Sequence, residues 1–201
     1  MDDVQQAIAR IKQGDLTGLE TLVRKYQVKA VYAAYLVLQD RQMAEDAAQN
    51  TFLHLVKRIG QYDDTRPFEP WLMRCVVNAA LDAARQTKRW VPLETGADTG
   101  ETMPVVWLTR SAPCPEDLVE TRELRQAVRA ALNKLHPEQR AAVVLRYFLE
   151  MSEAEMVQAL RKPPSTVKWR LHEAKRRLKE LLRPVLSSWS SEMREEEKCD
   201  E

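Results

Sequence analysis

Apolar side chains recur every three or four residues over two long stretches of this chain, residues 3–89 and 116–183. That spacing lines one face of an α-helix. Between the two stretches, residues 91–117 contain four prolines and two glycines, which argue against a helix in this segment. The pattern predicts an all-α protein of two small helical domains joined by a flexible linker.

The first stretch divides into four predicted helices, over residues 3–13, 15–38, 42–59 and 69–89. Gly14 and Gly60 end the first and third, while Asp15 and Asp40 can cap the second and third by accepting backbone N–H bonds. The predicted apolar face of the fourth helix comprises Leu72, Cys75, Val76, Ala79, Ala80 and Ala83. Its opposite side carries Trp71, Arg74, Asn78, Asp82 and Arg85.

The second stretch predicts helices over residues 116–135, 138–149, 152–160 and 165–183. Ser152 and Glu155 have capping-box spacing, and Pro163 and Pro164 restrict the turn before the last helix. A short helix, a tight turn and a longer basic helix make a helix-turn-helix. In this motif the N-terminal residues of the last helix enter the major groove of DNA, and basic residues further along reach phosphates.

Composition narrows the class of protein. Aromatic residues make up 6% of the chain and there are five glycines, which disfavours a β-sandwich or barrel. No apolar run approaches the ~18 residues that span a bilayer, and the acidic N-terminus does not resemble a secretion signal. Neither the three cysteines (Cys75, Cys114, Cys199) nor the dispersed histidines have metal-binding spacing. We expect a cytoplasmic protein without membrane insertion, metal, cofactor or enzyme site.

Charge is segregated along the chain, although the formal net charge is only +1. Residues 118–186 hold 15 basic and eight acidic residues, whereas residues 91–117 and 187–201 each carry a net charge of −4. This asymmetry favours one nucleic-acid-binding module flanked by acidic segments. The tail over 187–201 is expected to be disordered, or alternatively to compete with DNA for the basic last helix.

Four short motifs carry a family resemblance. They are Ala-Glu-Asp-Ala-Ala-Gln-Asn-Thr-Phe at 44–52, the Trp71–Arg85 segment with Asn78 and Asp82, Leu-His-Pro-Glu-Gln-Arg at 135–140, and Thr-Val-Lys-Trp-Arg-Leu-His at 166–172. In this order they resemble regions 2 and 4 of bacterial RNA polymerase sigma factors, in the extracytoplasmic-function (ECF) group of the sigma-70 family. The resemblance spans about residues 5–183.

The resemblance implies an alternative sigma factor that directs promoter-specific transcription initiation. It assigns residues 1–90 to region 2 (core polymerase docking, −10 recognition and melting), 91–117 to the linker, 118–186 to region 4 (−35 recognition) and 187–201 to the acidic tail. The implied partners are core RNA polymerase, through its β′ clamp helices and β flap, promoter DNA, and an anti-sigma factor.

Individual site residues follow from the same resemblance. Core polymerase binding is implied for Glu45, Asp46, Gln49 and Phe52. Binding of −10 DNA is implied for Tyr62, Phe68, Trp71, Arg74, Asn78, Arg85, Lys88 and Arg89. Binding of −35 DNA is implied for Ser165, Thr166, Lys168, Trp169, Arg170, His172, Lys175 and Arg176. Tyr62, in a polar loop, is the preferred base-stacking residue, whereas Phe68 could staple the helix start and Trp71 could belong to the core.

Several positions depart from the family's pattern. They are Met43 and Asn50 in the docking motif, Arg161 and Lys162 in place of a glycine and an apolar residue in the turn, and Trp169 and Glu173 on the last helix. Trp169 replaces a small serine. It therefore either contacts DNA and alters the −35 preference, or packs under the helix and adds stability.

Two other classes of protein remain open at this point. An ordinary helix-turn-helix regulator would use its first domain for a ligand or for dimerisation. A helical adaptor would bind protein only. Co-purification with core polymerase would distinguish a sigma factor from the ordinary regulator. Loss of salt-dependent DNA affinity in the second domain would favour the adaptor.

Overall fold

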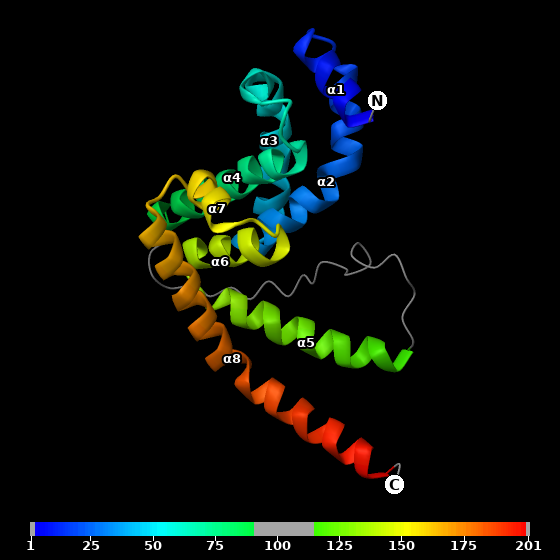
Figure 1. Cartoon of the computed structure of the whole chain (residues 1–201), viewed down its shortest axis with the longest axis vertical. Helices are drawn as coiled ribbons and strands as arrows, with labels where there is room; N and C mark the ends of the chain where they lie inside the picture. The colour runs from blue at the N-terminus through cyan, green and yellow to red at the C-terminus, as the bar shows by residue number, and fades with distance from the viewer. Residues whose placement is uncertain (1–2, 91–114, 200–201) are drawn as a thin grey trace.

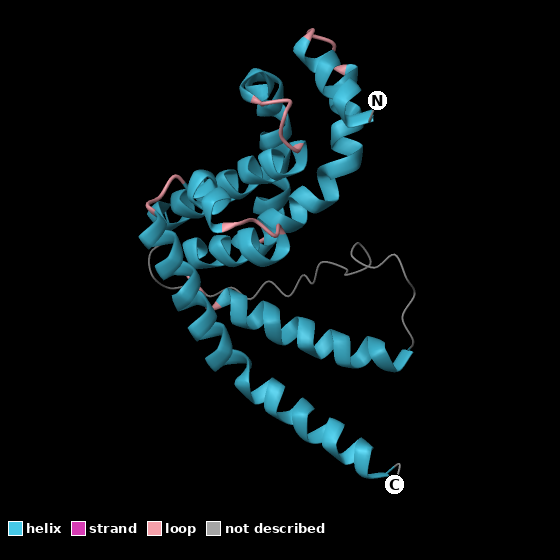
Figure 2. Cartoon of the chain, in the orientation of Figure 1, coloured by secondary structure: helices cyan, strands magenta, loops and turns pink. Residues whose placement is uncertain are grey.

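The computed structural model describes the backbone of residues 3–90 and 115–199, and the side chains of residues 3–87 and 124–185. Helices make up nearly all of these described segments, and none of them forms a strand (Figure 2). The predicted all-α fold is confirmed. The predicted linker falls almost entirely on residues 91–114, outside the described residues.

The N-terminal domain consists of α1 (Asp3–Lys12), α2 (Thr17–Leu38), α3 (Arg41–Arg58), a 3₁₀ turn η1 (Ile59–Gln61) and α4 (Phe68–Trp90). Local capping begins α3 as predicted, because Asp40 Oδ1 accepts a hydrogen bond of 2.8 Å from the Met43 N–H. Asp15 Oδ1 likewise accepts from the Thr17 N–H at 2.9 Å. Gly14 takes a φ of 87° after α1, a conformation open to glycine.

The C-terminal domain consists of α5 (Pro115–Asn133), α6 (Pro137–Val143), a π-helical turn η3 (Val144–Phe148), α7 (Glu153–Leu160) and α8 (Pro164–Cys199). The predicted capping box of Ser152 and Glu155 is present at the start of α7. A second box, which the sequence analysis missed, joins His136 and Gln139 at the start of α6.

Two predicted helix boundaries differ from the structure. The helix expected over 138–149 divides into α6 and the wider turn η3. The last helix, expected to end near residue 183, continues past Pro184 to Cys199, so the backbone of residues 187–199 is helical rather than disordered. Proline removes one backbone donor and disfavours the turn before it, but α8 accommodates Pro184 in its interior.

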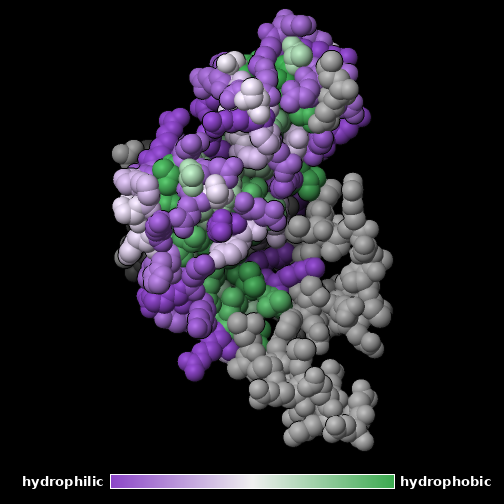
Figure 3. Space-filling model, viewed as in Figure 1, coloured by the Kyte–Doolittle hydropathy of each residue, from purple (hydrophilic) through white to green (hydrophobic). Residues whose placement is uncertain are grey.

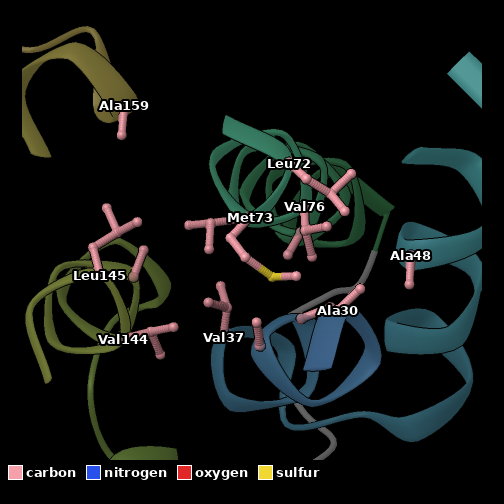
Figure 4. Close-up of a cluster of buried hydrophobic side chains, with 14 of the residues drawn as sticks. Ala30, Val37, Ala48, Leu72, Met73, Val76, Val144, Leu145 and Ala159 are labelled. Carbon is pink, nitrogen blue, oxygen red and sulfur yellow. The ribbon is translucent and has the colours of Figure 1, made fainter. Parts of the chain in front are cut away.

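The two domains pack directly against each other. Helices α6 and α7 lie beside α2 and α4, and α8 crosses the outer side of α6 (Figure 1). Where the domains meet, Val37 of α2, Met73 of α4 and Leu145 of η3 gather in one buried cluster (Figure 4). Tyr32 and Phe148 add an edge-to-face ring contact with centroids 5.2 Å apart. One continuous apolar core therefore spans both domains.

This packing explains which residues of α4 are buried. Met73 and Val77 are almost fully buried, whereas Cys75 and Ala79, which the sequence assigned to the inner face, are only half-buried. The buried face is rotated because α4 has two neighbours: the rest of its own domain and the C-terminal domain. In α2, all of residues 33–37 are buried, which requires cover on every side of the helix.

Candidate functional sites

The N-terminal half of α8 presents an outward, largely basic surface. Most of the side chains predicted to bind −35 DNA are exposed on it: Ser165, Lys168, Trp169, His172, Lys175 and Arg176, with Thr166 half-buried. Trp169 is 62% exposed. The alternative in which this indole packs under the helix is therefore wrong.

Arg170 departs from the predicted arrangement. Its side chain is only 12% exposed and forms an ion pair with Glu138 of α6. The apolar face of α8 packs on α6, so the residue next to that face is turned inward toward the carboxylate. Arg170 thus fixes α8 to α6 and is not presented to phosphates.

Neighbouring groups already engage part of the basic surface. Arg176 bridges Glu173 and Glu180 at 2.6 and 2.8 Å. The hydrogen bond from Arg176 lowers the pKa of Glu173, so that carboxylate stays ionised beside its cations. Lys175 lies 5.7 Å from the ring centre of Tyr147, which is 55% exposed on η3. Tyr147 therefore borders the predicted DNA surface, although its sequence position gave no signal of this.

Three of the four residues predicted to dock on polymerase lie on the surface of α3. Glu45, Asp46 and Gln49 are exposed, and Glu45 pairs with Arg41 at 2.9 Å. Phe52 is 6% exposed and belongs to the core, so the expected role as an anchor on the surface is wrong.

Leu53, which the sequence analysis missed, is 60% exposed one position further along α3. It follows Asp46 and Gln49 at seven and four residues, so the three side chains share one helix face.

Tyr62 occupies a different environment from the one predicted. It is 4% exposed, and its ring lies 5.3 Å from Phe68 and 5.5 Å from Trp71. Its hydroxyl donates to the Arg66 carbonyl, and burial raises its pKa. The apolar neighbours come from the start of α4, beyond the polar loop that frames Tyr62 in the sequence. Tyr62 therefore holds the loop and is not available for stacking on a base in this conformation.

Phe68 is 4% exposed and also contacts Tyr26, at 5.7 Å between ring centres. Of the two roles that the sequence analysis considered for Phe68, the structure shows packing at the start of α4. The expected contact of Phe68 with DNA is wrong for this conformation. Trp71 is half-buried at the edge of the same cluster. It keeps one side toward the surface.

The polar side of α4 faces the C-terminal domain. The Asn78 side-chain amide donates to the Ala159 carbonyl at 2.9 Å. Arg85 pairs with Asp82 at 3.0 Å and with Glu138 of the other domain at 3.1 Å. Arg74 is half-buried nearby, whereas the side chains of Lys88 and Arg89 lie outside the described residues. Residues predicted to read −10 DNA are thus engaged across the domain contact.

In the described segments, no group of three or more His, Cys, Asp or Glu side chains is arranged to hold a metal ion. Cys75 is half-buried, and burial raises its pKa, while Cys114 and the side chain of Cys199 lie outside the described part. None of the described helices is both long and apolar enough to cross a bilayer.

Hydrophilic residues cover most of the described surface in Figure 3. The large apolar side chains that stay exposed are Leu16, Val28, Leu53, Tyr147 and Trp169. Trp169 lies on α8 and Tyr147 lies beside it, while Leu53 lies on the carboxylate face of α3. Exposed apolar groups therefore coincide with two of the three predicted contact surfaces.

Comparisons with known proteins agree with this layout. The family model for Sigma-70 region 2 matches residues 22–90, and that for Sigma-70, region 4 matches residues 125–178. ECF RNA polymerase sigma factor SigW of Bacillus subtilis (strain 168) is 30% identical over 184 residues, covering 90% of this chain and 98% of that protein. RNA polymerase sigma-H factor of Pseudomonas aeruginosa is 26% identical over 183 residues, covering 90% and 95%.

Among solved structures, the sigma factor RpoE of Bartonella quintana, in complex with the anti-sigma factor NepR, has the same fold. The TM-score is 0.61 at 20% identity, over 82% of this chain and 96% of that one. Both regions are thus matched in order, and one relative is 30% identical over nearly its whole length. The chain belongs to the extracytoplasmic-function group of the sigma-70 family of RNA polymerase sigma factors.

Proposed function

We propose that this sigma factor docks on core RNA polymerase through α3 and directs it to promoters by binding −35 DNA with α8 and −10 DNA with α4. The observation that carries the proposal is the exposed N-terminal half of α8, where Lys168, Trp169 and Lys175 project from a helix-turn-helix. In that motif this end of the second helix enters the major groove.

Docking on polymerase is assigned to the exposed carboxylates Glu45 and Asp46, with Gln49 and Leu53 on the same side of α3. Charged groups at such a rim set the partner and the rate of encounter, while an exposed leucine supplies apolar area. We assign binding of the β′ clamp helices to this face of α3 and binding of the β flap to the C-terminal domain. Phe52 is not part of the docking face, because it is buried in the core.

Binding of −10 DNA is assigned to Arg74, Asn78 and Arg85, with Trp71 at the edge of the same face. Asn78 and Arg85 contact the C-terminal domain in this conformation, so they reach DNA after the domains separate. A partner that holds the domains together would block this step. The Bartonella relative is seen with an anti-sigma factor, and we extend that class of partner to this chain.

The test is transcription in vitro with purified core polymerase, on a template carrying DNA from upstream of the chain's own coding sequence. Glu45→Lys with Asp46→Lys should abolish the sigma-dependent transcript and core binding while leaving helicity unchanged. The matched control, Glu20→Lys with Asp64→Lys, reverses two exposed carboxylates elsewhere in the same domain and should retain both activities. Undiminished core binding by the α3 variant would overturn the docking assignment.

A further inference from the structure

A polar cavity of about 610 Å³ lies between the two domains, and cations from both domains line it. We call it the interdomain cleft. It is bounded by α3, η1 and α4 on one side and by the end of α7, the following turn and α8 on the other. Its cationic residues are Arg58, Arg74, Arg85, Arg161, Lys162 and Arg170, whereas Asp82 supplies the one carboxylate among its described lining residues.

Among the side chains that the structure describes, most of these cations have no carboxylate partner. Arg85 and Arg170 both form ion pairs with Glu138, which is not itself a lining residue of the cleft. Within the described part of the chain, the other four cations of the cleft (Arg58, Arg74, Arg161 and Lys162) form no ion pair. The closed arrangement therefore concentrates positive charge that the described side chains do not neutralise.

Guanidinium groups from both domains act electrostatically on one side chain of the cleft, Cys75. Burial raises the pKa of the Cys75 thiol, and the charges of Arg74, Arg58 and Arg161 all act on it in the opposite direction. Arg161 belongs to the C-terminal domain, whereas Arg58 and Arg74 belong to the N-terminal domain. Cations from both domains thus lie within electrostatic reach of one point in the cleft.

Two of these cations come from the turn that departs from the family's pattern. Arg161 has φ 50° and ψ 45°, the left-handed region that favours glycine, and the family's pattern has a glycine there. Lys162 stands in place of an apolar residue. This chain therefore has an arginine in an unfavourable backbone conformation at the mouth of a cleft that is already basic.

Closing the domains brings like charges together, which opposes closure unless an anion lies between them. Guanidinium groups bind phosphate oxygens in pairs of parallel hydrogen bonds, and a volume of this size is that of a small-molecule site. We propose that the interdomain cleft binds a small molecule with a polyphosphate group, and that the bound polyphosphate holds the two domains closed.

The consequence for transcription rests on the proposed function. Arg74, Asn78 and Arg85 line the cleft in the closed chain and are assigned to −10 DNA in the open one. A ligand that binds the closed state better shifts the population toward it. Polyphosphate and promoter DNA therefore exclude each other.

Binding is tested on the full chain by calorimetry, with sodium triphosphate, ATP without magnesium, and adenosine as probes. Triphosphate and ATP should bind with similar affinity and adenosine should not bind, because the phosphate chain is the recognised group. Binding of ATP without binding of triphosphate would overturn the proposal by making the base the determinant. A peptide of residues 187–201 that binds the cleft more tightly than triphosphate would also overturn it, since the site would then take an acidic peptide.

The variant Arg161→Gly with Lys162→Val removes two cations of the cleft, and its fold is not at risk because glycine suits the turn. It should lower triphosphate affinity about tenfold, as expected for the loss of charge-assisted hydrogen bonds. Lys57→Gln with Lys134→Gln removes two exposed cations outside the cleft and should change affinity less than twofold. Equal losses in the two variants would show non-specific attraction and overturn the assignment.

Closure is measured separately, by small-angle scattering of a loosened chain. Phe148→Ala removes the ring contact with Tyr32 across the domains without touching the cleft. Triphosphate should reduce the radius of gyration of this variant to that of the wild type, and no change on saturation would overturn the closing role. None of these measurements uses polymerase or promoter DNA, so their outcomes do not depend on the proposed function.

Discussion

Trp169 illustrates how exposure of one side chain restricts its role. Its indole is 62% exposed on the outward face of α8, beside Lys168 and His172. An exposed ring adds little to folding stability, but it offers apolar area to a partner. In a major groove the thymine methyl group is the apolar feature that such a ring can contact. We therefore expect this departure from serine to act on DNA preference rather than on stability.

We predict that Trp169→Ser changes the preferred −35 sequence and alters the free energy of unfolding by less than about 0.5 kcal/mol, the usual range for surface substitutions. Selection of −35 variants from a randomised pool, run beside urea unfolding, checks both parts. Leu53→Ser, which removes another exposed apolar side chain on α3, should leave the −35 preference unchanged. A clear loss of stability with an unchanged preference would contradict this assignment.

At the scale of elements, Glu138 joins three helices through one carboxylate. It lies in the first turn of α6 and pairs with Arg170 of α8 and with Arg85 of α4. Burial opposes its ionisation, but the hydrogen bond from Arg85 and the charges of Arg170, Arg85 and His136 outweigh this and lower its pKa. Arg170 depends on the pair most, because its side chain is 12% exposed whereas that of Arg85 is 52% exposed.

We predict that Glu138→Gln lowers the free energy of unfolding at pH 7 by about 1–3 kcal/mol, because the mostly covered guanidinium of Arg170 loses its charged partner. The pKa of Glu138 is lower in the folded chain than in the unfolded one, so its contribution is present above the unfolded value and is lost as the pH falls through the folded value. The difference between wild type and variant should therefore shrink as the pH falls below about 4.3, the ordinary glutamate pKa.

Urea unfolding over a pH series measures this difference. Glu180→Gln provides the control, since Glu180 forms an exposed pair with Arg176 at 2.8 Å. Exposed pairs contribute at most about 1 kcal/mol, so this variant should stay close to the wild type at every pH. A Glu138→Gln effect that is constant with pH would show that the carboxylate charge is not responsible.

At the scale of the whole molecule, the C-terminal domain covers part of the surface of α4, because α6 and α7 both contact that helix. Met73, Val77 and Leu81 recur every four residues along α4, so they share one face, and all are nearly fully buried. In Figure 4 the side chain of Met73 lies between α4 and α2, near Val37, while α6 and α7 of the C-terminal domain contact α4 as well. When the domains separate, the part of α4 that they cover must meet solvent or a partner.

We predict that the fragment of residues 1–90 self-associates in a concentration-dependent manner and unfolds at lower urea concentration than the full chain. Val77→Ser should restore the monomer in the fragment, yet cost about 1–3 kcal/mol in the full chain, where the side chain is buried. Sedimentation velocity and urea unfolding on both lengths test this. A monomeric fragment that is as stable as the full chain would contradict the existence of an uncovered face.

The sequence by itself determined most of the local structure. The side chains of Asp40 and Ser152 cap helices as predicted, because a cap needs only a hydrogen-bond acceptor within three residues of a free N–H. The period of the apolar positions located each helix to within a few residues, except where the predicted helix over 138–149 divides and α8 runs on past Pro184. The family motifs also identified the exposed face of α3 and the outward face of α8.

Only the tertiary structure decided which side of each helix is covered and by what. Tyr62 and Phe52 are core residues, and Arg170 is turned toward Glu138, because their neighbours come from segments far away in the chain. The same holds for the rotated face of α4 and for the contact of Asn78 with Ala159, 81 residues away. A periodic pattern records that a helix has an apolar face, but burial depends on every surface that packs against it. That information lies in the packing of the two domains.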